Sequence, residues 1–521
     1  YKRQESYWYN MIIFNIIQIY KRMMLNMRVA IIGMGTAGVS VLRQLVKHKD
    51  FKQLKVDVYD NEFNMGQGVP FQNDSSQLLI NLPTKNMSLN LDDDEEFWKW
   101  YQTQSDFTFK NPKYLPRFVF GHYMKSYLSN YETLYDNLTV IKQPVQEVFI
   151  NSNIDETTLK YYVCTSKDMK HCQVYDYIFL TIGTLSYHDP YHLKGIKGYI
   201  QTPYPTYNTL DDVQESDDIA IIGTGLASLD VVRYVAFHHP KLPITMTSRS
   251  AQLPSVRGNM KKIEFQYLTK SKFNDIKDKY FGNVPLEKAF DLFKEECELN
   301  GIDLQKLVHR RTGDTIKDLN YDLEHPNEIG IFQTLIENVK ENLNWIWNSF
   351  SRQDQIEFDK RFTKIIQLNS NPMPPRTAKL IKQLIKDGSL VIRKDLEDVV
   401  HKNGIFNLKF KHDEQWYPHH IIINATGSKT HLKDLDEDDQ FILNLQNRQI
   451  IQAHPMGGIQ IIPETNQVIS PRYGTLNNMI AIGQITNGVN KLRNGVKMIV
   501  NQAVSAVDYL YEIRKEFDHK A

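Results

Sequence analysis

The sequence predicts an α/β fold in which one strand-turn-helix unit occurs twice and a long helical segment follows the second copy. Three observations support this prediction. A buried strand, a glycine-rich turn and an amphipathic helix follow one another at residues 28–48, and the same order recurs at residues 217–239. Between residues 256 and 388, helical periodicity replaces the strand pattern.

The composition is that of a folded, soluble protein. The chain has 521 residues, of which 41% are hydrophobic and 24% charged, so neither a disordered chain nor a coiled coil fits the whole. This length suggests two to four domains of about 100 to 200 residues each. Basic and acidic residues nearly balance, with 62 Lys and Arg against 61 Asp and Glu and a formal net charge of +1. This balance disfavours binding to nucleic acid or to an anionic membrane surface.

Cysteine and histidine usage predicts neither a disulfide framework nor a metal site. The three cysteines, Cys164, Cys172 and Cys297, form no C-x-x-C motif and no closely spaced pair. We therefore expect no disulfide scaffold, no thiolate zinc site and no vicinal dithiol redox centre, which fits a cytoplasmic protein. The paired histidines are adjacent in the chain, and adjacent strand residues point to opposite faces, so they are not expected to chelate one ion.

Residues 1–26 differ from the rest of the chain. Their single apolar patch is shorter than the roughly 20 residues of a membrane helix, and no small-residue cleavage signal follows it. Met27 stands directly before the first buried strand. We expect an N-terminal extension outside the fold and no membrane anchor, with a surface helix as the alternative.

The first unit carries the pattern of a dinucleotide site. In GMGTAG, Gly33 makes the tight turn, Gly35 lets the backbone approach a pyrophosphate, and Gly38 allows close helix packing. The helix that follows presents free N–H groups to the phosphates. Asp60 ends the next strand, 22 residues after Gly38, where a carboxylate accepts hydrogen bonds from a ribose diol. If the glycines served only a tight turn, Asp60 would have no role.

The second unit, GTGLAS, keeps Gly223 and Gly225 and has Ser228, still a small residue, at the third position. Its second strand ends in Ser-Arg-Ser, so Arg249 stands where the first unit has an acid. A guanidinium pairs with a 2′-phosphate in charge-assisted bonds, which favours NADPH over NADH. The alternative is a solvated arginine at a strand end.

Three later strands end in small residues where the chain passes between the two units. They are followed by Gly183 and Thr184, by Gly427, and by Gly483. Such ends let a backbone pass close to a bound dinucleotide. Together they match the arrangement of flavoproteins with two dinucleotides, so the fold class becomes two Rossmann-like dinucleotide-binding domains with a helical insertion.

Most of residues 27–515 resembles the FAD-NAD(P)-binding family of bacterial flavoproteins, which is similar in outline to N-hydroxylating and flavin-containing monooxygenases. The resemblance rests on MGQGVPFQNDSSQLLINLPTKNMSL, FWKWYQ, YLPRFVFGHYMKSYL and YDYIFLTIGT. It implies that Gly66 and Gly68 begin a loop lining the flavin and that Asn81 falls in the Leu-Asn motif after it. It also places Arg117 and Gly121 in a Pro-Arg…Gly-x-Tyr motif.

One position departs from related flavoproteins. Many of them have an aspartate after the glycine of the last strand, where it holds the flavin ribityl chain, whereas this chain has Gln484 after Gly483. We expect flavin contact there through backbone N–H groups and a side-chain amide.

The predicted boundaries assign each part of the chain to one domain. After the extension, the first part of the FAD domain is residues 27–210, and its return is residues 433–521. The first part of the NADPH domain is residues 211–255, and its return is residues 389–432. Between the two parts of the NADPH domain lies the helical insertion or cap, residues 256–388.

The predicted function is that of an FAD-dependent oxidoreductase in which NADPH reduces the flavin and oxygen is used to hydroxylate a small molecule. No residue pattern identifies a catalytic side chain, which is consistent with chemistry supplied by the cofactor. Two alternatives stay open: a reductase that passes electrons to another acceptor, and a non-catalytic dinucleotide-binding regulator. The sequence specifies neither the substrate nor the oligomeric state.

Overall fold

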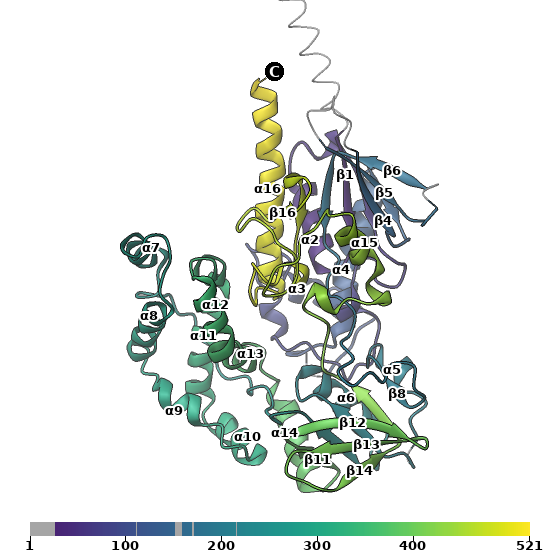
Figure 1. The fold of residues 1–521 in the computed structure, drawn as a ribbon, viewed down its shortest axis with the longest axis vertical. Coiled ribbons are helices and arrows are strands. Elements are labelled where there is room, and N and C mark those ends of the chain that lie inside the picture. Colours follow the sequence, from purple (N-terminus) through teal and green to yellow (C-terminus); the bar gives the residue numbers. More distant parts are fainter. Residues whose placement is uncertain (1–26, 111, 152–158, 169–170, 215, 521) are drawn as a thin grey trace, which may run out of the picture.

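The structure is a computed structural model that describes residues 27–520 apart from 111, 152–158, 169–170 and 215. The expected N-terminal extension, residues 1–26, lies outside the described residues. Two sheet domains lie one above the other in Figure 1, and the teal helices of the insertion lie beside them. Within the described residues we find no helix with both the length and the apolar content that crossing a membrane requires.

The first sheet has six strands in the order β16-β17-β7-β1-β2-β3, and every neighbouring pair is parallel except β16-β17. Near-continuous apolar runs form its central strands because both faces are covered. Helices α2, α4 and α16 contribute to the core on one side. The strands are β1 (Met27–Ile32), β2 (Leu54–Tyr59), β3 (Leu138–Ile141), β7 (Tyr177–Leu180), β16 (Gln467–Ser470) and β17 (Gly474–Ala481); the helices are α2 (Thr36–Lys47), α3 (Glu96–Gln102), α4 (Arg117–Leu134) and α16 (Val496–Lys520).

The second sheet has five parallel strands in the order β11-β10-β9-β15-β8. Helices α6 and α14 pack against it and share one apolar core with its strands. The elements are β8 (Tyr199–Ile200), β9 (Ile219–Ile222), β10 (Ile244–Thr247), β11 (Leu390–Arg393), β15 (Ile421–Asn424), α5 (Thr206–Thr209), α6 (Leu226–His238) and α14 (Pro375–Lys386).

Two small antiparallel sheets, one beside each domain, complete the strands. The first consists of β4 (Glu147–Asn151), β5 (Lys160–Cys164) and β6 (Cys172–Tyr175), and α15 (Gln440–Asn447) packs near β4. The second consists of β12 (Leu396–Lys402), β13 (Ile405–Phe410) and β14 (Trp416–His419).

The expectation of no disulfide was wrong for one pair. Cys164 and Cys172 stand directly opposite each other across β5 and β6, and their sulfur atoms form a disulfide. The two cysteines are eight residues apart in the chain, and the sequence did not reveal the hairpin that brings them together. The third cysteine, Cys297, is free and buried.

The insertion is helical, as its periodicity predicted. Residues at steps of four on α11, namely Leu335, Val339, Leu343 and Trp347, are all buried in its core. The indole N–H of Trp347 donates to the carbonyl oxygen of Gly488 at 2.8 Å, which joins the insertion to the C-terminal part of the first domain. The helices are α7 (Lys270–Lys279), α8 (Leu286–Leu299), α9 (Leu304–His309), α10 (Thr315–Glu324), α11 (Pro326–Trp347), α12 (Arg352–Phe358) and α13 (Lys364–Ser370), with a π-helical turn η4 (Asp359–Thr363) between the last two.

Two segments pack with a different domain than the expected boundaries imply. Strand β8 pairs with β15 in the second sheet, although it lies within residues 27–210. Helix α14 packs on the second sheet through Ala378 and Ile381, although it lies within residues 256–388. Strand β8 is two residues long and gives no periodic signal, and the apolar stripe of α14 does not reveal which surface it covers.

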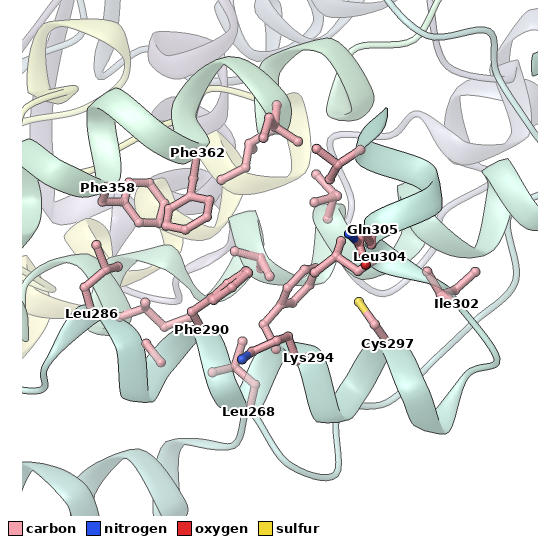
Figure 2. Close-up of a pocket in the computed structure, with 18 of the residues that line it drawn as sticks. Leu268, Leu286, Phe290, Lys294, Cys297, Ile302, Leu304, Gln305, Phe358 and Phe362 are labelled. Atoms are coloured by element: carbon pink, nitrogen blue, oxygen red, sulfur yellow. The ribbon is translucent and has the colours of Figure 1, made fainter. Parts of the chain in front are cut away.

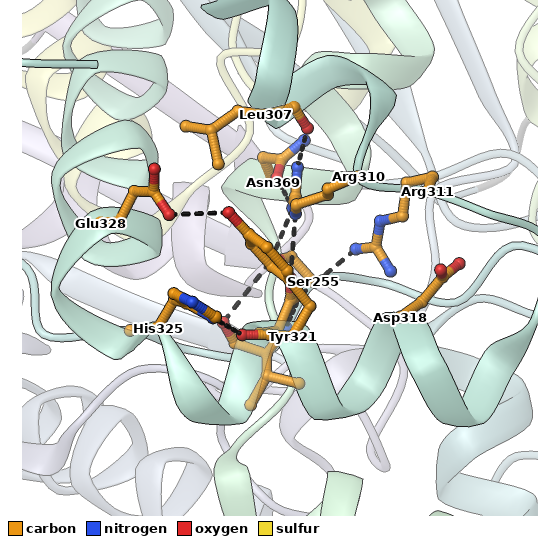
Figure 3. A network of polar contacts seen from close by, with 12 residues as sticks. Ser255, Leu307, Arg310, Arg311, Asp318, Tyr321, His325, Glu328 and Asn369 are labelled. Atoms are coloured by element: carbon orange, nitrogen blue, oxygen red, sulfur yellow. Dashed lines mark hydrogen bonds and ion pairs between the residues drawn. The ribbon is translucent and has the colours of Figure 1, made fainter. Parts of the chain in front are cut away.

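A buried polar network attaches the insertion to the second domain (Figure 3). Its centre is the carboxylate of Asp322 on α10, which is fully buried. Arg310 donates to it at 2.9 Å, and Ser255 Oγ and the Val256 backbone N–H donate at 2.8 and 2.9 Å. Arg310 also donates to Asn369 on α13 at 2.8 Å. One carboxylate therefore joins α10, α13 and the chain that leaves the second sheet.

Replacing Asp322 with alanine should loosen the insertion, because Arg310 and the Ser255 segment lose a buried partner. Removal of one member of a buried ion pair costs about 3–5 kcal/mol. Amide hydrogen exchange in α10 and α13 should accelerate accordingly. Glu328→Gln is the control, since Glu328 pairs with a half-exposed Lys306 and the loss of an exposed pair destabilises far less than the loss of a buried one. Equal rates of amide hydrogen exchange in α10 and α13 of the two variants would contradict a central role for Asp322.

Candidate functional site

A cavity of about 560 Å³ opens at the carboxyl ends of the first sheet. This edge is where open α/β sheets bind their ligands. Ten of the residues singled out in the sequence line it: Gly33, Gly35, Asp60, Gly68, Asn81, Arg117, Gly183, Thr184, Gly483 and Gln484. Segments from the beginning, middle and end of the chain thus meet around one cavity.

The glycine turn of the first unit has the geometry that its spacing predicted. Gly33 has φ +100°, and a Cβ there would lie 2.5 Å from the carbonyl oxygen of Thr181. A Cβ on Gly38 would lie 2.0 Å from the carbonyl oxygen of Gly33, so only glycine allows this helix to start so close to the turn. Gly38 itself serves this packing and does not line the cavity.

Gly35 and Gly68 face each other across the cavity wall. A Cβ on Gly68 would lie 2.9 Å from the Cα of Gly35, and one on Gly35 would lie 3.4 Å from the Cα of Gly68. Gly66 is set back from the cavity, with φ +78° and a Cβ position 3.1 Å from Leu128 on α4. The two loops therefore pack against each other backbone to backbone, and Gly35 and Gly68 both line the cavity, where a pyrophosphate needs close backbone approach.

Asp60 is held beside the cavity by two backbone donors. Its carboxylate accepts from the N–H of Met34 at 2.7 Å and from the N–H of Asn61 at 2.8 Å. Burial raises the pKa of Asp60, and the two N–H donors oppose that rise. A carboxylate oriented in this way can still accept hydrogen bonds from a ribose diol.

The C-terminal segment closes the cavity from the other side. Gly483 has φ +92°, and its N–H donates to Gln502 Oε1 at 3.2 Å. The cavity lining continues through Gly495 and Val496, where α16 begins. The N-terminus of a long helix thus faces the cavity, which favours an anionic group there.

Arg117, which the family resemblance pointed to, lines the cavity and joins the two domains. Its guanidinium lies 2.6 Å from the carboxylate of Asp230 on α6, and Tyr204 Oη donates to the same carboxylate at 2.7 Å. Burial raises the pKa of Asp230, and Arg117 opposes that rise. The sequence offered no signal for Asp230, because its partner is far away in the chain.

The second glycine turn repeats the geometry of the first at the second sheet. Gly223 has φ +125°, and a Cβ there would lie 2.5 Å from the carbonyl oxygen of Ala425. Gly225 precedes α6 and faces open space, with no atom within 4 Å of a Cβ position. Ser228 is fully buried beneath the turn. Gly427 lies at the neighbouring strand end, where its carbonyl oxygen accepts from the His188 N–H at 3.0 Å.

Arg249 is exposed just after the end of β10. A second cation, Lys364, lies nearby, which the sequence did not reveal. Lys364, on α13 of the insertion, donates to Ser250 Oγ at 2.7 Å. Burial lowers the pKa of Lys364, and the nearby charge of Arg249 lowers it further. Two cations and the hydroxyls of Ser248 and Ser250 therefore surround the position expected for a 2′-phosphate.

The fold and the first cavity define a flavoprotein with two nucleotide-binding domains. Residues 30–185 match the family model described as FAD-NAD(P)-binding, which identifies FAD and a nicotinamide dinucleotide as the cofactors. A search of curated proteins finds no match.

Solved structures share the fold over nearly the whole chain. Ornithine hydroxylase from Pseudomonas aeruginosa is 10% identical with a TM-score of 0.57, and the match covers 94% of this chain and 99% of that one. L-lysine 6-monooxygenase from Pseudomonas syringae is 11% identical with a TM-score of 0.57 and the same coverage. The ornithine N-hydroxylase of Kutzneria sp. 744 is 11% identical with a TM-score of 0.55, again over 94% and 99%. At these identities the likeness concerns the fold.

Replacing Gly35 with valine should strip FAD from the protein, because the side chain would occupy the narrow space opposite Gly68. We expect the flavin content of the purified protein, read from visible absorbance, to fall by roughly tenfold or more. Gly225→Val at the second turn is the matched control and should keep its flavin. Full flavin content in Gly35→Val would show that FAD does not bind at the first turn.

Replacing Arg249 with alanine should weaken the binding of NADPH and leave the binding of NADH nearly unchanged. Loss of a charge-assisted contact to the 2′-phosphate costs about 1.5–3 kcal/mol, or roughly ten- to a hundredfold in affinity. Lys364→Ala should act in the same direction, while the exposed Lys360→Ala should not. Titrations of flavin reduction with each nucleotide give the comparison, and equal loss for both nucleotides would assign Arg249 to a structural role.

Proposed function

We propose that this protein is an FAD-dependent monooxygenase that uses NADPH to hydroxylate a small molecule. The observation that carries the proposal is the pair of complete dinucleotide turns, one on the flavin cavity and one beside the Arg249 cation cluster, joined by the buried Arg117–Asp230 pair. This arrangement suits electron transfer from a phosphorylated nicotinamide to a flavin in one chain.

The residues of the chain would divide the work between binding and orientation. Asp60 would bind the ribose of FAD, and the N-terminus of α16 would stabilise negative charge at the cavity. Arg249 and Lys364 would select NADPH. The chemistry that FAD supplies when bound is uptake of two electrons from NADPH and their delivery to oxygen.

A disulfide reductase is less well supported by the position of the cysteines. Such an enzyme needs a thiol pair beside the flavin, whereas none of the three cysteines lines the described flavin cavity. The disulfide of Cys164 and Cys172 lies in the small sheet outside that cavity. The names of the structural neighbours, which are hydroxylases and monooxygenases of ornithine and lysine, make amine hydroxylation the first reaction to test.

We further propose that the helical insertion sets substrate access. Asn371, directly after α13, lines the flavin cavity, so the insertion reaches it. The ion pair between Asp359 and Lys491 and the bond from Trp347 to Gly488 hold it against the segment that leads into α16. A cover of this kind keeps water away from reacting groups.

The test is oxygen uptake by the FAD-loaded protein with NADPH and a panel of amines, with mass spectrometry of the products. We expect one hydroxylated product per NADPH consumed. Gly223→Val should keep its flavin but lose NADPH oxidation, because it blocks the second turn. NADPH oxidation with a dye acceptor but no hydroxylated product would establish a reductase. Protein that holds FAD and oxidises no NADPH with any acceptor would favour the regulator.

A further inference from the structure

A second cavity lies inside the helical insertion, between α8, α9, α11 and the segment from α12 to α13 (Figure 2). Its volume is about 650 Å³, within the range of small-molecule sites. It shares no lining residue with the flavin cavity. Nothing in the proposed oxidoreductase chemistry requires it, so it needs an explanation of its own.

The cavity wall is apolar. Five phenylalanines line it, and Figure 2 shows Phe290, Phe358 and Phe362 among them. The rings of Phe290 and Phe362 are in contact, with centroids 5.1 Å apart. Protein interiors normally pack at the density of organic crystals, and apolar cavities do not retain ordered water. A wall of this composition therefore favours an apolar ligand over solvent.

The cavity is elongated along α8. Its lining residues on this helix recur at steps of three and four from Leu286 to Glu298, which spans about 18 Å of helix. This stripe is the face that an amphipathic helix normally buries in a core. Here it lines open space, so the ligand should be a chain rather than a compact ring.

The charges around the cavity disfavour an anionic head group. One lysine, Lys294, two carboxylates, Glu298 and Asp303, and one histidine, His309, line it. The Lys294 ammonium is already paired with Asp291 at 2.8 Å, and Asp303 accepts from the Lys306 N–H at the start of α9. No unpaired lysine or arginine in the described lining is left for a carboxylate or phosphate. The exposed amide of Gln305, at the α9 end, suits a neutral hydroxyl or carbonyl.

We propose that the insertion carries a second ligand site, which binds a long-chain alkyl compound with an uncharged polar head group. The alkyl chain lies along α8 against the phenylalanine rings, and the head group lies near Gln305 at the end of the cavity. The site is distinct from the flavin cavity, so its occupation does not displace FAD.

Binding of the neutral dye Nile red to the FAD-loaded protein tests the proposal. We expect saturable fluorescence enhancement with one dye per chain, displaced by tetradecanol at concentrations at least tenfold lower than by tetradecanoate. Octanol should displace the dye less well than tetradecanol. Equal displacement by alcohol and acid, or no saturable binding, would overturn the proposal.

Two substitutions on α8 locate the site. Ala289 lines the cavity, so Ala289→Trp should reduce dye affinity at least tenfold, whereas Leu299→Trp, at an exposed position on the same helix, should not. Flavin content should stay unchanged in both. If Ala289→Trp binds the dye as the wild type does, the cavity is not the site.

The wild-type protein offers a test that does not depend on a variant folding. Cys297, the free cysteine, lines the cavity, and burial raises the pKa of its thiol to about 12, so modification should be slow. Saturating tetradecanol should slow its reaction with methyl methanethiosulfonate at least tenfold, measured by mass spectrometry. An unchanged rate would overturn the proposal. So would dye binding only on dissociation of a dimer, because a second copy would then fill the cavity.

Discussion

The buried pair of Arg117 and Asp230 is the contact on which the arrangement of the two nucleotide-binding domains depends. The two side chains are only 16% and 7% exposed, and they come from helices that start at the carboxyl ends of different sheets. A charge buried at such a junction is costly unless it is paired, so the domains are restricted to positions that keep the pair together. Arg117 also lines the flavin cavity, which links domain position directly to cofactor binding.

The insertion is attached to both domains by contacts of different kinds. Asp322 and its donors fix it to the second domain, while Trp347 and the Asp359–Lys491 pair fix it to the first. Through Lys364 it also supplies a cation beside the second dinucleotide turn. The helices therefore do more than cover a cleft, since they place Lys364 against the end of the second sheet and hold a cavity of their own.

Much of the fold could be predicted from short stretches of sequence. The two strand-turn-helix units and the helical character of the insertion follow from local periodicity and glycine spacing. Around the cavity, Gly33, Gly35 and Asp60 follow from the same patterns, whereas Gly68, Asn81 and Arg117 came from the family resemblance. The disulfide was missed because the turn that brings Cys164 opposite Cys172 gives no clear pattern. The packing of β8 and α14 was missed because an apolar stripe shows that a face is buried but does not show against which partner.

The sequence by itself determined where the tight turn and the start of the next helix lie, because the glycines at Gly33 and Gly38 are local requirements of that turn and that helix. Only the tertiary structure decided which distant groups meet. Lys364 and Ser250 are 114 positions apart, and no periodicity relates them. The apolar face of α8 has the same sequence pattern whether it covers a core or lines a cavity. Amphipathic spacing predicts that a helix face is buried, but it does not predict what fills the space beside that face.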